Sequence, residues 1–191
     1  MPGDTVLIQG TGGVSLFGVQ FAVAAGATVV ATTSSNEKFD LLKRLGARHV
    51  LNYREKPDWG HAARKLTPNG EGFDTVLEVG GPNTLGESLK AVKPGGDIHL
   101  IGFLGGVEQN PQATIWQARQ AMCNLKSVVV GSRVQFEQMN RAIEGLQLKP
   151  VVDESTFGFE QLPDAYQYIM DGKHVGKVVV DVDRSAVAAS S

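Results

Sequence analysis

A glycine-rich turn near the N-terminus constrains the fold more than any other feature of this sequence. The apolar run at residues 6–8 leads into the letters GTGG at 10–13, and a helical pattern of apolar residues comes next. Gly10, Gly12 and Ser15 fill the three positions of a G-x-G-x-x-G pattern, with serine as a small substitute for the third glycine. This order of strand, turn and helix is typical of the corner that holds the phosphates of a dinucleotide.

Strand patterns and helical patterns alternate through most of the sequence. We expect strands at 5–10, 27–33, 49–51, 73–79, 97–102 and 125–131. We expect helices at 13–25, 36–45, 58–66, 83–92, 114–122 and 136–146. Because such alternation places helices on both faces of a parallel sheet, the sequence predicts an α/β fold. It is a Rossmann-type doubly wound six-stranded parallel sheet in the order 3-2-1-4-5-6.

The residues from Lys149 onward break this rhythm. Their patterns predict a strand at 150–152, a helix at 160–171 and a final strand at 175–182. A six-stranded sheet does not need this C-terminal strand-helix-strand appendage. We therefore divide the chain into a dinucleotide-binding domain at 1–148 and an appendage at 149–184, and we expect a flexible tail at 185–191.

Charge and cysteine content argue against several classes of partner. The formal net charge is −2, so no overall field attracts nucleic acid or an anionic membrane. No apolar run reaches the ~20 residues that a membrane span requires. Cys123 is the single cysteine, so no internal disulfide can form, which favours a reducing compartment. The N-terminus leads directly into a strand without a signal-peptide pattern, and we therefore expect a cytoplasmic protein.

Several stretches in one order resemble the cofactor-binding half of the medium-chain dehydrogenases/reductases. They read PGDTVLIQGTGGVSLFGVQFA, GFDTVLEVGG, LIGF and GKVVV, and they are similar to the quinone oxidoreductase-like and zinc-type alcohol dehydrogenase-like branch. The resemblance implies an oxidoreductase that acts on a small-molecule carbonyl, alcohol or activated alkene. It also implies that an N-terminal catalytic domain, which carries the zinc ligands where zinc is used, is missing here. Residues 149–184 resemble the segment that returns to that domain.

The end of the second expected strand bears on the choice between NADP and NAD. An NAD site places an acidic residue about 20 residues past the glycines, where it binds the ribose 2′-hydroxyl. Here the sequence reads ATTSSN at 31–36, and the resemblance implies that Thr33 fills the acidic position. Hydroxyls do not repel a 2′-phosphate, and a lysine nearby can supply positive charge. We predict NADP, with NAD possible, bound here by Thr33, Ser34, Ser35, Lys38 and, by similarity to NADPH-dependent quinone reductases, Tyr53.

The rest of the predicted cofactor site is backbone at the carboxyl ends of strands, where open parallel sheets bind their ligands. In the glycine turn the candidates are Gly10, Thr11, Gly12, Gly13 and Val14. After the fourth and fifth expected strands they are Val79, Gly80, Ile101, Gly102 and Phe103. The resemblance implies that this second group approaches the ribose and the nicotinamide.

No catalytic residue can be named from the sequence. None of the three tyrosines is followed four residues later by lysine, so the Tyr-x-x-x-Lys pair of short-chain dehydrogenases is missing. The four histidines and Cys123 do not have metal-ligand spacing, so we expect no metal site and no zinc in this chain. We interpret His99 as a packed core residue, Cys123 as an inert small hydrophobe and Glu78 as a carboxylate without a chemical role.

Two expectations concern assembly and turnover. The last strand of the sheet lies at an edge, and its β-branched residues without proline favour pairing with another chain. The resemblance implies a homodimer through this edge, from Lys126 to Gly131. We predict the cofactor-binding part of an NADP(H)-dependent oxidoreductase, and the alternative is a non-catalytic dinucleotide-binding or interaction module. A methyltransferase is disfavoured because no acidic residue directly follows the second strand.

Overall fold

The structure, a computed structural model, describes residues 1–102 and 113–182, and a six-stranded parallel sheet lies at its centre. The strands are β1 (Thr5–Gln9), β2 (Thr28–Thr33), β3 (His49–Asn52), β4 (Phe73–Glu78), β5 (Val92–Leu100) and β6 (Asn124–Ser127). They lie in the order β3-β2-β1-β4-β5-β6, and each neighbouring pair is parallel. The predicted α/β fold and its strand order are therefore confirmed.

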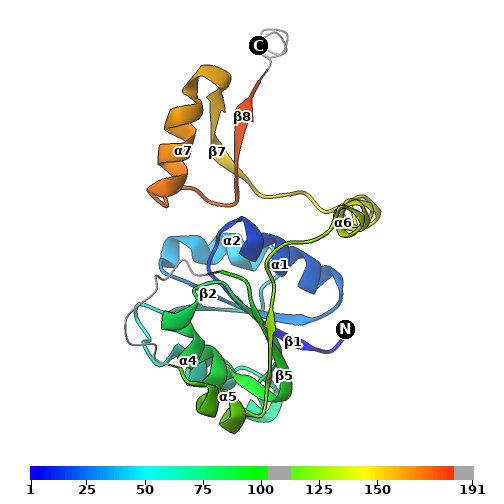
Figure 1. The fold of residues 1–191 in the computed structure, drawn as a ribbon, viewed down its shortest axis with the longest axis vertical. Helices are drawn as coiled ribbons and strands as arrows, with labels where there is room; N and C mark the ends of the chain where they lie inside the picture. Colours follow the sequence, from blue (N-terminus) through cyan, green and yellow to red (C-terminus); the bar gives the residue numbers. More distant parts are fainter. Residues whose placement is uncertain (103–112, 183–191) are drawn as a thin grey trace.

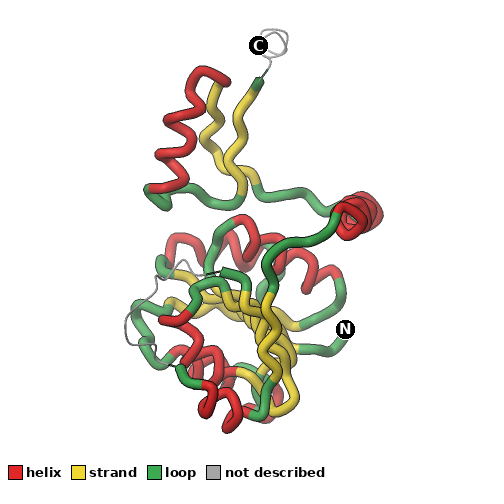
Figure 2. The backbone as a smooth tube through the Cα atoms, in the orientation of Figure 1, coloured by secondary structure: helices red, strands yellow, loops and turns green. Residues whose placement is uncertain are grey.

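Helices cover both faces of the sheet (Figure 2). One face carries α1 (Gly13–Ala24) and α2 (Phe39–Arg44), and the other carries α3 (Trp59–Arg64), α4 (Pro82–Ala91) and α5 (Ile115–Ala121). Successive side chains of a strand point to opposite faces. In β1, Leu7 therefore packs in one hydrophobic cluster, while Val6 and Ile8 pack in the other. Burial of each such side chain stabilises the fold by roughly 1.5–3 kcal/mol.

In the six-stranded sheet, two strand boundaries differ from the prediction by more than two residues. β5 begins at Val92 and not at residue 97, because residues 94–96 form a bulge inside the strand, where its pairing with β4 shifts register. Gly95 supplies the left-handed backbone of this bulge, with a φ of +77°. β6 ends at Ser127 and not at residue 131, and Val130 beyond it is 86% exposed. The edge is thus shorter than expected, and the homodimer through it stays a prediction.

The C-terminal residues form a second, smaller unit beyond α1 and α2 (Figure 1). Its strands β7 (Val152–Gly158) and β8 (Lys177–Asp181) pair in parallel, and α7 (Leu162–Met170) connects them. The strand expected at 150–152 was placed wrongly, because the polar stretch after Val152 is itself the strand. Val151 and Val175 pack against the cluster formed with α1. The domain limits stay predictions, and the tail at 185–191 lies outside the described residues.

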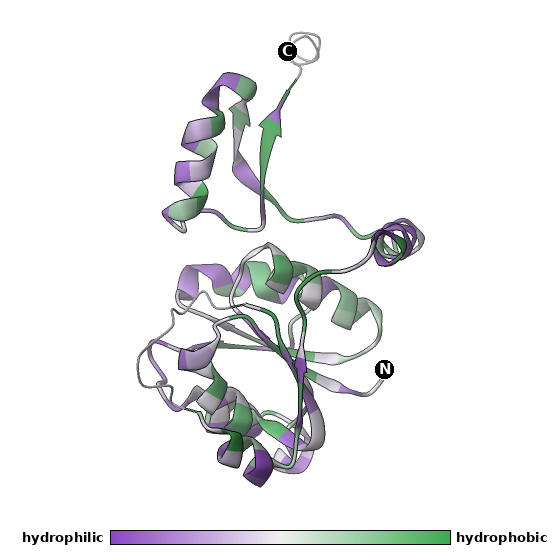
Figure 3. Cartoon of the chain, in the orientation of Figure 1, coloured by the Kyte–Doolittle hydropathy of each residue, from purple (hydrophilic) through white to green (hydrophobic). Residues whose placement is uncertain are grey.

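One long helix, α6 (Arg133–Gly145), lies between the two units and contributes little to the core. None of its residues is buried, and Val134 and Phe136 are 61% and 58% exposed. Figure 3 shows α6 as largely hydrophilic, in contrast to the apolar β8. Within the described ranges, no helix combines the length and apolar character that crossing a membrane requires.

Candidate functional site

The glycine turn forms a tight corner between β1 and α1. Gly10 has a φ of +76°, a conformation that a side chain would strain, and its N–H donates to the Thr32 carbonyl at 2.8 Å. Gly12 is the N-cap of α1, and no side chain caps the helix. Because the first N–H groups of an α-helix have no partner inside the helix, α1 presents a partial positive charge at this turn.

Ser15 shows how the third glycine position accepts a side chain. Its Oγ donates to the Gln9 carbonyl at 2.6 Å, and the residue is buried. This bond ties the first turn of α1 to the end of β1. Of the other predicted turn residues, Thr11 is buried and Val14 is 52% exposed. The shape of the corner is therefore determined by the protein's own contacts.

The C-terminal unit brings a cation to this corner, which no sequence pattern indicated. Lys177 begins β8, and a methyl group built on Gly13 would lie 2.7 Å from its Nζ. The neighbouring Gly176 donates its N–H to the Thr11 carbonyl at 3.4 Å. The ammonium also lies 5.9 Å from the centroid of the Phe17 ring. A cation beside a helix N-terminus is electrostatically unfavourable, and an anion between them would relieve the repulsion.

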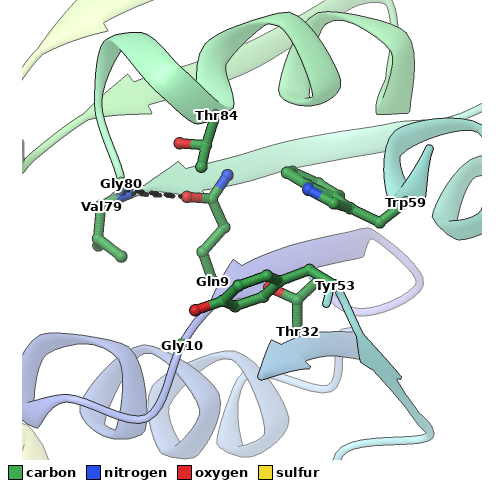
Figure 4. Close-up of a pocket in the computed structure, with 8 residues that line it drawn as sticks. All are labelled: Gln9, Gly10, Thr32, Tyr53, Trp59, Val79, Gly80 and Thr84. Atoms are coloured by element: carbon green, nitrogen blue, oxygen red, sulfur yellow. Dashed lines mark hydrogen bonds between the residues drawn. The ribbon is translucent and has the colours of Figure 1, made fainter. Parts of the chain in front are cut away.

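A cavity of about 270 Å³ opens beside the turn, at the carboxyl ends of the central strands (Figure 4). It is lined by Gln9, Gly10, Thr32, Tyr53, Trp59, Val79, Gly80 and Thr84. Tyr53 is 39% exposed, whereas Trp59 is 5% exposed and belongs to the core. The cavity thus brings together four of the predicted residues from three separate loops: Gly10, Tyr53, Val79 and Gly80.

A buried hydrogen-bond network shapes one wall of this cavity. Figure 4 shows the Gln9 side chain pointing toward the backbone of Val79 and Gly80. Its Oε1 accepts hydrogen bonds from the N–H groups of both residues, at 3.2 Å each. The Gln9 Nε2 donates to Glu78 Oε2 at 2.7 Å, and Glu78 is 0% exposed. The carboxylate also accepts hydrogen bonds from the Gly80 and Gly81 N–H groups and from the hydroxyls of Thr84 and Ser88. Glu78 therefore holds the backbone after β4 in place.

Apart from Tyr53, which follows β3, the residues expected to bind at the 2′-phosphate lie in one turn after β2. Ser35 is the N-cap of the 3-10 helix η1 (Asn36–Lys38), and its Oγ accepts a backbone N–H of that helix at 3.3 Å. Thr33 is 1% exposed, and its Oγ1 lies 3.4 Å from the Ser35 carbonyl, so this hydroxyl faces the turn itself. Ser34, Ser35 and Lys38 are half-buried. The same turn exposes Asn36 and Glu37, so a ligand can reach all of these side chains except that of Thr33.

A carboxylate from another loop lies beside this turn. Glu55 follows β3, and its Oε1 accepts hydrogen bonds from the Nδ2 atoms of Asn36 (2.6 Å) and Asn52 (3.0 Å). Asn52 ends β3 in register with Thr33 at the end of β2. The pairing of these strands brings Glu55 to the turn, although Glu55 follows a different strand in the sequence.

The backbone after β5 lies against the backbone after β4. The N–H groups of Ile101 and Gly102 both donate to the Glu78 carbonyl, at 2.9 and 3.3 Å. A methyl group on Gly102 would come within 2.5 Å of the Val79 carbonyl oxygen, so glycine permits this approach. The remaining residue predicted here, Phe103, lies outside the described residues.

Comparison with known proteins assigns the family. The sequence profile described as zinc-binding dehydrogenase matches residues 13–145. The chain belongs to the zinc-binding dehydrogenase family. A zinc-type alcohol dehydrogenase-like protein of Schizosaccharomyces pombe is 44% identical over 184 residues, covering 95% of this chain and 53% of that protein. The quinone oxidoreductase of Mus musculus is 28% identical over 184 residues, covering 93% of this chain and 55% of that protein.

Solved structures of zinc-binding dehydrogenase relatives share the fold. An NAD-dependent alcohol dehydrogenase superposes with a TM-score of 0.85 at 30% identity, covering 95% of this chain and 52% of that one. A mycobacterial protein solved with NADPH has a TM-score of 0.78 at 28% identity, covering 94% of this chain and 58% of that one. The chain spans about half the length of the curated relatives it matches.

The zinc-binding dehydrogenase family is named for a metal that the described residues do not fit. Within 1–102 and 113–182, no group of three or more His, Cys, Asp or Glu side chains is placed to hold a metal ion. Cys123 packs against the core, and burial raises the pKa of its thiol. His99 in β5 is half-buried, so it is less enclosed than the expected core histidine. We assign no chemical step to zinc in this chain.

Proposed function

We propose that this chain is the cofactor-binding part of an NADP(H)-dependent oxidoreductase of the zinc-binding dehydrogenase family. The observation that carries the proposal is the corner at α1, where the glycine turn, the uncapped helix and the Lys177 ammonium beside Gly13 meet. Helix amides and a cation attract an anion to one point. In folds of this kind, the pyrophosphate of a dinucleotide supplies that anion.

The cavity beside the corner suits the adenosine end of the dinucleotide. Its walls combine an aromatic ring, that of Tyr53, with backbone and small side chains after β1 and β4. Such mixed, largely apolar pockets bind planar ligands, with a few polar groups for orientation. The Gln9 and Glu78 network keeps this wall rigid, because it occupies the N–H groups of Val79 and Gly80. Ligand contact there would therefore use carbonyls and side chains.

The preference for NADP(H) over NAD(H) rests on the turn after β2. The hydroxyls of Ser34 and Ser35 and the Lys38 ammonium can donate charge-assisted hydrogen bonds to a 2′-phosphate. The position that would carry an acid in an NAD site is Thr33, which is uncharged. Solved relatives include both an NAD-dependent enzyme and an NADPH complex. The support for a preference for NADP(H) therefore comes from the residues of this turn.

The proposed substrate is a small-molecule carbonyl, alcohol or activated alkene. Relatives include a zinc-type alcohol dehydrogenase-like protein and a quinone oxidoreductase, and hydride transfer is the chemistry that a nicotinamide coenzyme supplies when bound. The residues of this chain bind and orient the coenzyme. We propose that the substrate pocket requires the part of the relatives' length that this chain does not span.

A titration of NADPH fluorescence, repeated with NADH, tests the proposal. We expect saturable NADPH binding with a Kd in the micromolar range, about −8 kcal/mol of binding free energy. NADH is expected to bind about tenfold more weakly, because the Lys38 ammonium has no 2′-phosphate to contact. The absence of saturable binding by either nucleotide refutes the proposal.

Three lysine variants separate the contributions of the two phosphate sites. Lys38→Ala should weaken NADPH binding about tenfold and leave NADH binding nearly unchanged, because the lysine ammonium would contact the 2′-phosphate that NADH lacks. Lys177→Gln should weaken both nucleotides by a similar factor, because both carry the pyrophosphate. Lys65→Ala is the matched control: it removes an exposed positive charge just after α3 and should change neither Kd. Equal losses of both nucleotides in Lys38→Ala would contradict the assigned 2′-site.

The alternative is a dinucleotide-binding or interaction module without turnover. The half-length match to the relatives favours it, because the chain spans 53% and 55% of the two named above. Reduction of a small panel of quinones and enals by NADPH decides between the two. NADPH binding without oxidation of the coenzyme identifies the module, whereas turnover by the chain alone identifies the oxidoreductase.

A further inference from the structure

The Glu55 carboxylate occupies a place that the proposed 2′-phosphate site would need to keep free of negative charge. Its Oε1 accepts a hydrogen bond from Asn36 at 2.6 Å, and Asn36 directly follows Ser35. It also accepts from Asn52 at 3.0 Å, and Asn52 pairs in register with Thr33. Both donors border the turn after β2, so the carboxylate lies at the rim of that turn.

Several hydrogen bonds hold the carboxylate in this position. Asn52 is 8% exposed, its Oδ1 accepts the Arg54 N–H at 3.0 Å, and its Nδ2 also donates to Asn36 Oδ1 at 2.9 Å. The two asparagines therefore form a bridge between the loops after β2 and β3. Glu55 is anchored to this bridge, in contrast to a surface acid that moves freely in solvent.

The charge of Glu55 acts differently on the two coenzymes. A carboxylate next to a 2′-phosphate repels it and offsets the attraction of Lys38. A carboxylate can accept a hydrogen bond from a ribose 2′-hydroxyl, as the acid after β2 does in an NAD site. Both effects shift the balance toward NAD(H). Because Glu55 is exposed, salt screens its charge, which limits the effect to a modest factor.

We propose that Glu55 is a specificity-determining residue. It limits the preference for NADP(H), so that NAD(H) can still compete for the same site. The inference rests on the proposed function, because it requires that the turn after β2 receive the 2′-position of a bound coenzyme. The specificity of this chain is then set by two loops: Lys38 after β2 favours the phosphate, and Glu55 after β3 opposes it.

The test measures Kd for NADP⁺ and NAD⁺ by calorimetry in wild type, Glu55→Gln and Glu55→Ala. Glu55→Gln keeps an acceptor for the two asparagines and removes the charge, so NADP⁺ should bind about three- to tenfold more tightly. NAD⁺ binding should stay unchanged or weaken, and the gain for NADP⁺ should shrink between 50 and 500 mM NaCl. Glu55→Ala should raise the same selectivity ratio, with weaker binding of both coenzymes because the bridge loses its acceptor.

Glu144→Gln is the matched control, because it removes an exposed acid from α6 and should leave the ratio as in wild type. A ratio within twofold of wild type in both Glu55 variants, with saturable binding retained, overturns the inference and leaves the proposed function standing. A wild-type chain that binds neither coenzyme refutes the proposed function and this inference together.

Discussion

Replacement of Glu78 by alanine tests whether the buried network after β4 holds the fold as well as the cavity. Gly80, Thr84 and Gln9 each have a second hydrogen bond in the structure. Among the described residues, the Gly81 N–H has Glu78 as its acceptor, at 3.0 Å. The Ser88 hydroxyl also donates to Glu78, but it can rotate to a carbonyl one turn earlier in α4. Removal of the carboxylate therefore leaves the buried Gly81 N–H without an acceptor, which costs about 1–3 kcal/mol.

The void left by the side chain adds to this cost. A cavity penalty of ~24 cal/mol per Å³ over the lost carbon and oxygen atoms amounts to about 1–2 kcal/mol. Together the two effects predict a loss of about 2–5 kcal/mol in the free energy of unfolding. With a urea m-value of about 2 kcal/mol/M, the midpoint should fall by about 1–2.5 M.

Urea titration followed by far-UV circular dichroism measures this change. Glu78→Gln should lose about half as much free energy of unfolding. Its amide keeps the shape of the side chain and one acceptor oxygen for the Gly80 and Gly81 N–H groups. Glu144→Ala on the exposed face of α6 should stay within about 0.5 kcal/mol of wild type. A midpoint shift below about 0.5 M in Glu78→Ala, or an equal shift in Glu78→Gln, refutes the reasoning.

Two further predictions concern stability. Burial alone would raise the pKa of Asp74, but hydrogen bonds from Lys93 and Thr5 outweigh it and hold that pKa below its ordinary value of 3.8. The stability these bonds contribute is present above the unfolded pKa and lost as pH falls through the folded pKa. The Asp74→Asn variant should therefore lose less stability than wild type as the pH falls from about 5 downward, and thermal unfolding at each pH measures this difference. Gly60→Ala would place a methyl group 2.2 Å from the Glu87 carbonyl oxygen, so calorimetry should show a loss of about 1–3 kcal/mol.

The strands of the sheet could be predicted because each carries its own local signal, and their order because alternating strands and helices are typical of the doubly wound fold. The β5 boundary could not, because Pro94 and Gly95 usually end a strand, and here the neighbouring strands carry β5 through the irregularity as a bulge. The start of β7 was missed for a related reason. Asp153 looks like a loop residue in the sequence, but its carboxylate accepts the N–H groups of Ser155 and Val175 and stabilises the strand from its side.

The candidate site was predictable where its residues follow a strand directly, as in the glycine turn and at Ser35. Lys177 and Glu55 could not be found in this way, because their places depend on how β8 approaches α1 and on how β3 pairs with β2. The same holds for Gln9, which looks like an ordinary strand end in the sequence. Its role becomes visible when β4 lies beside β1.

The contact between Gly176 and Thr11 joins two residues that lie 165 positions apart in the sequence. During translation, the residues of the six-stranded sheet leave the ribosome before Lys177 does. Contacts between residues this far apart in sequence form late in folding, because closing a long loop loses entropy before any stabilising contact has formed. The sheet can therefore form before Lys177 reaches the corner at α1, and a chain released before Lys177 is made would have the glycine turn without its cation.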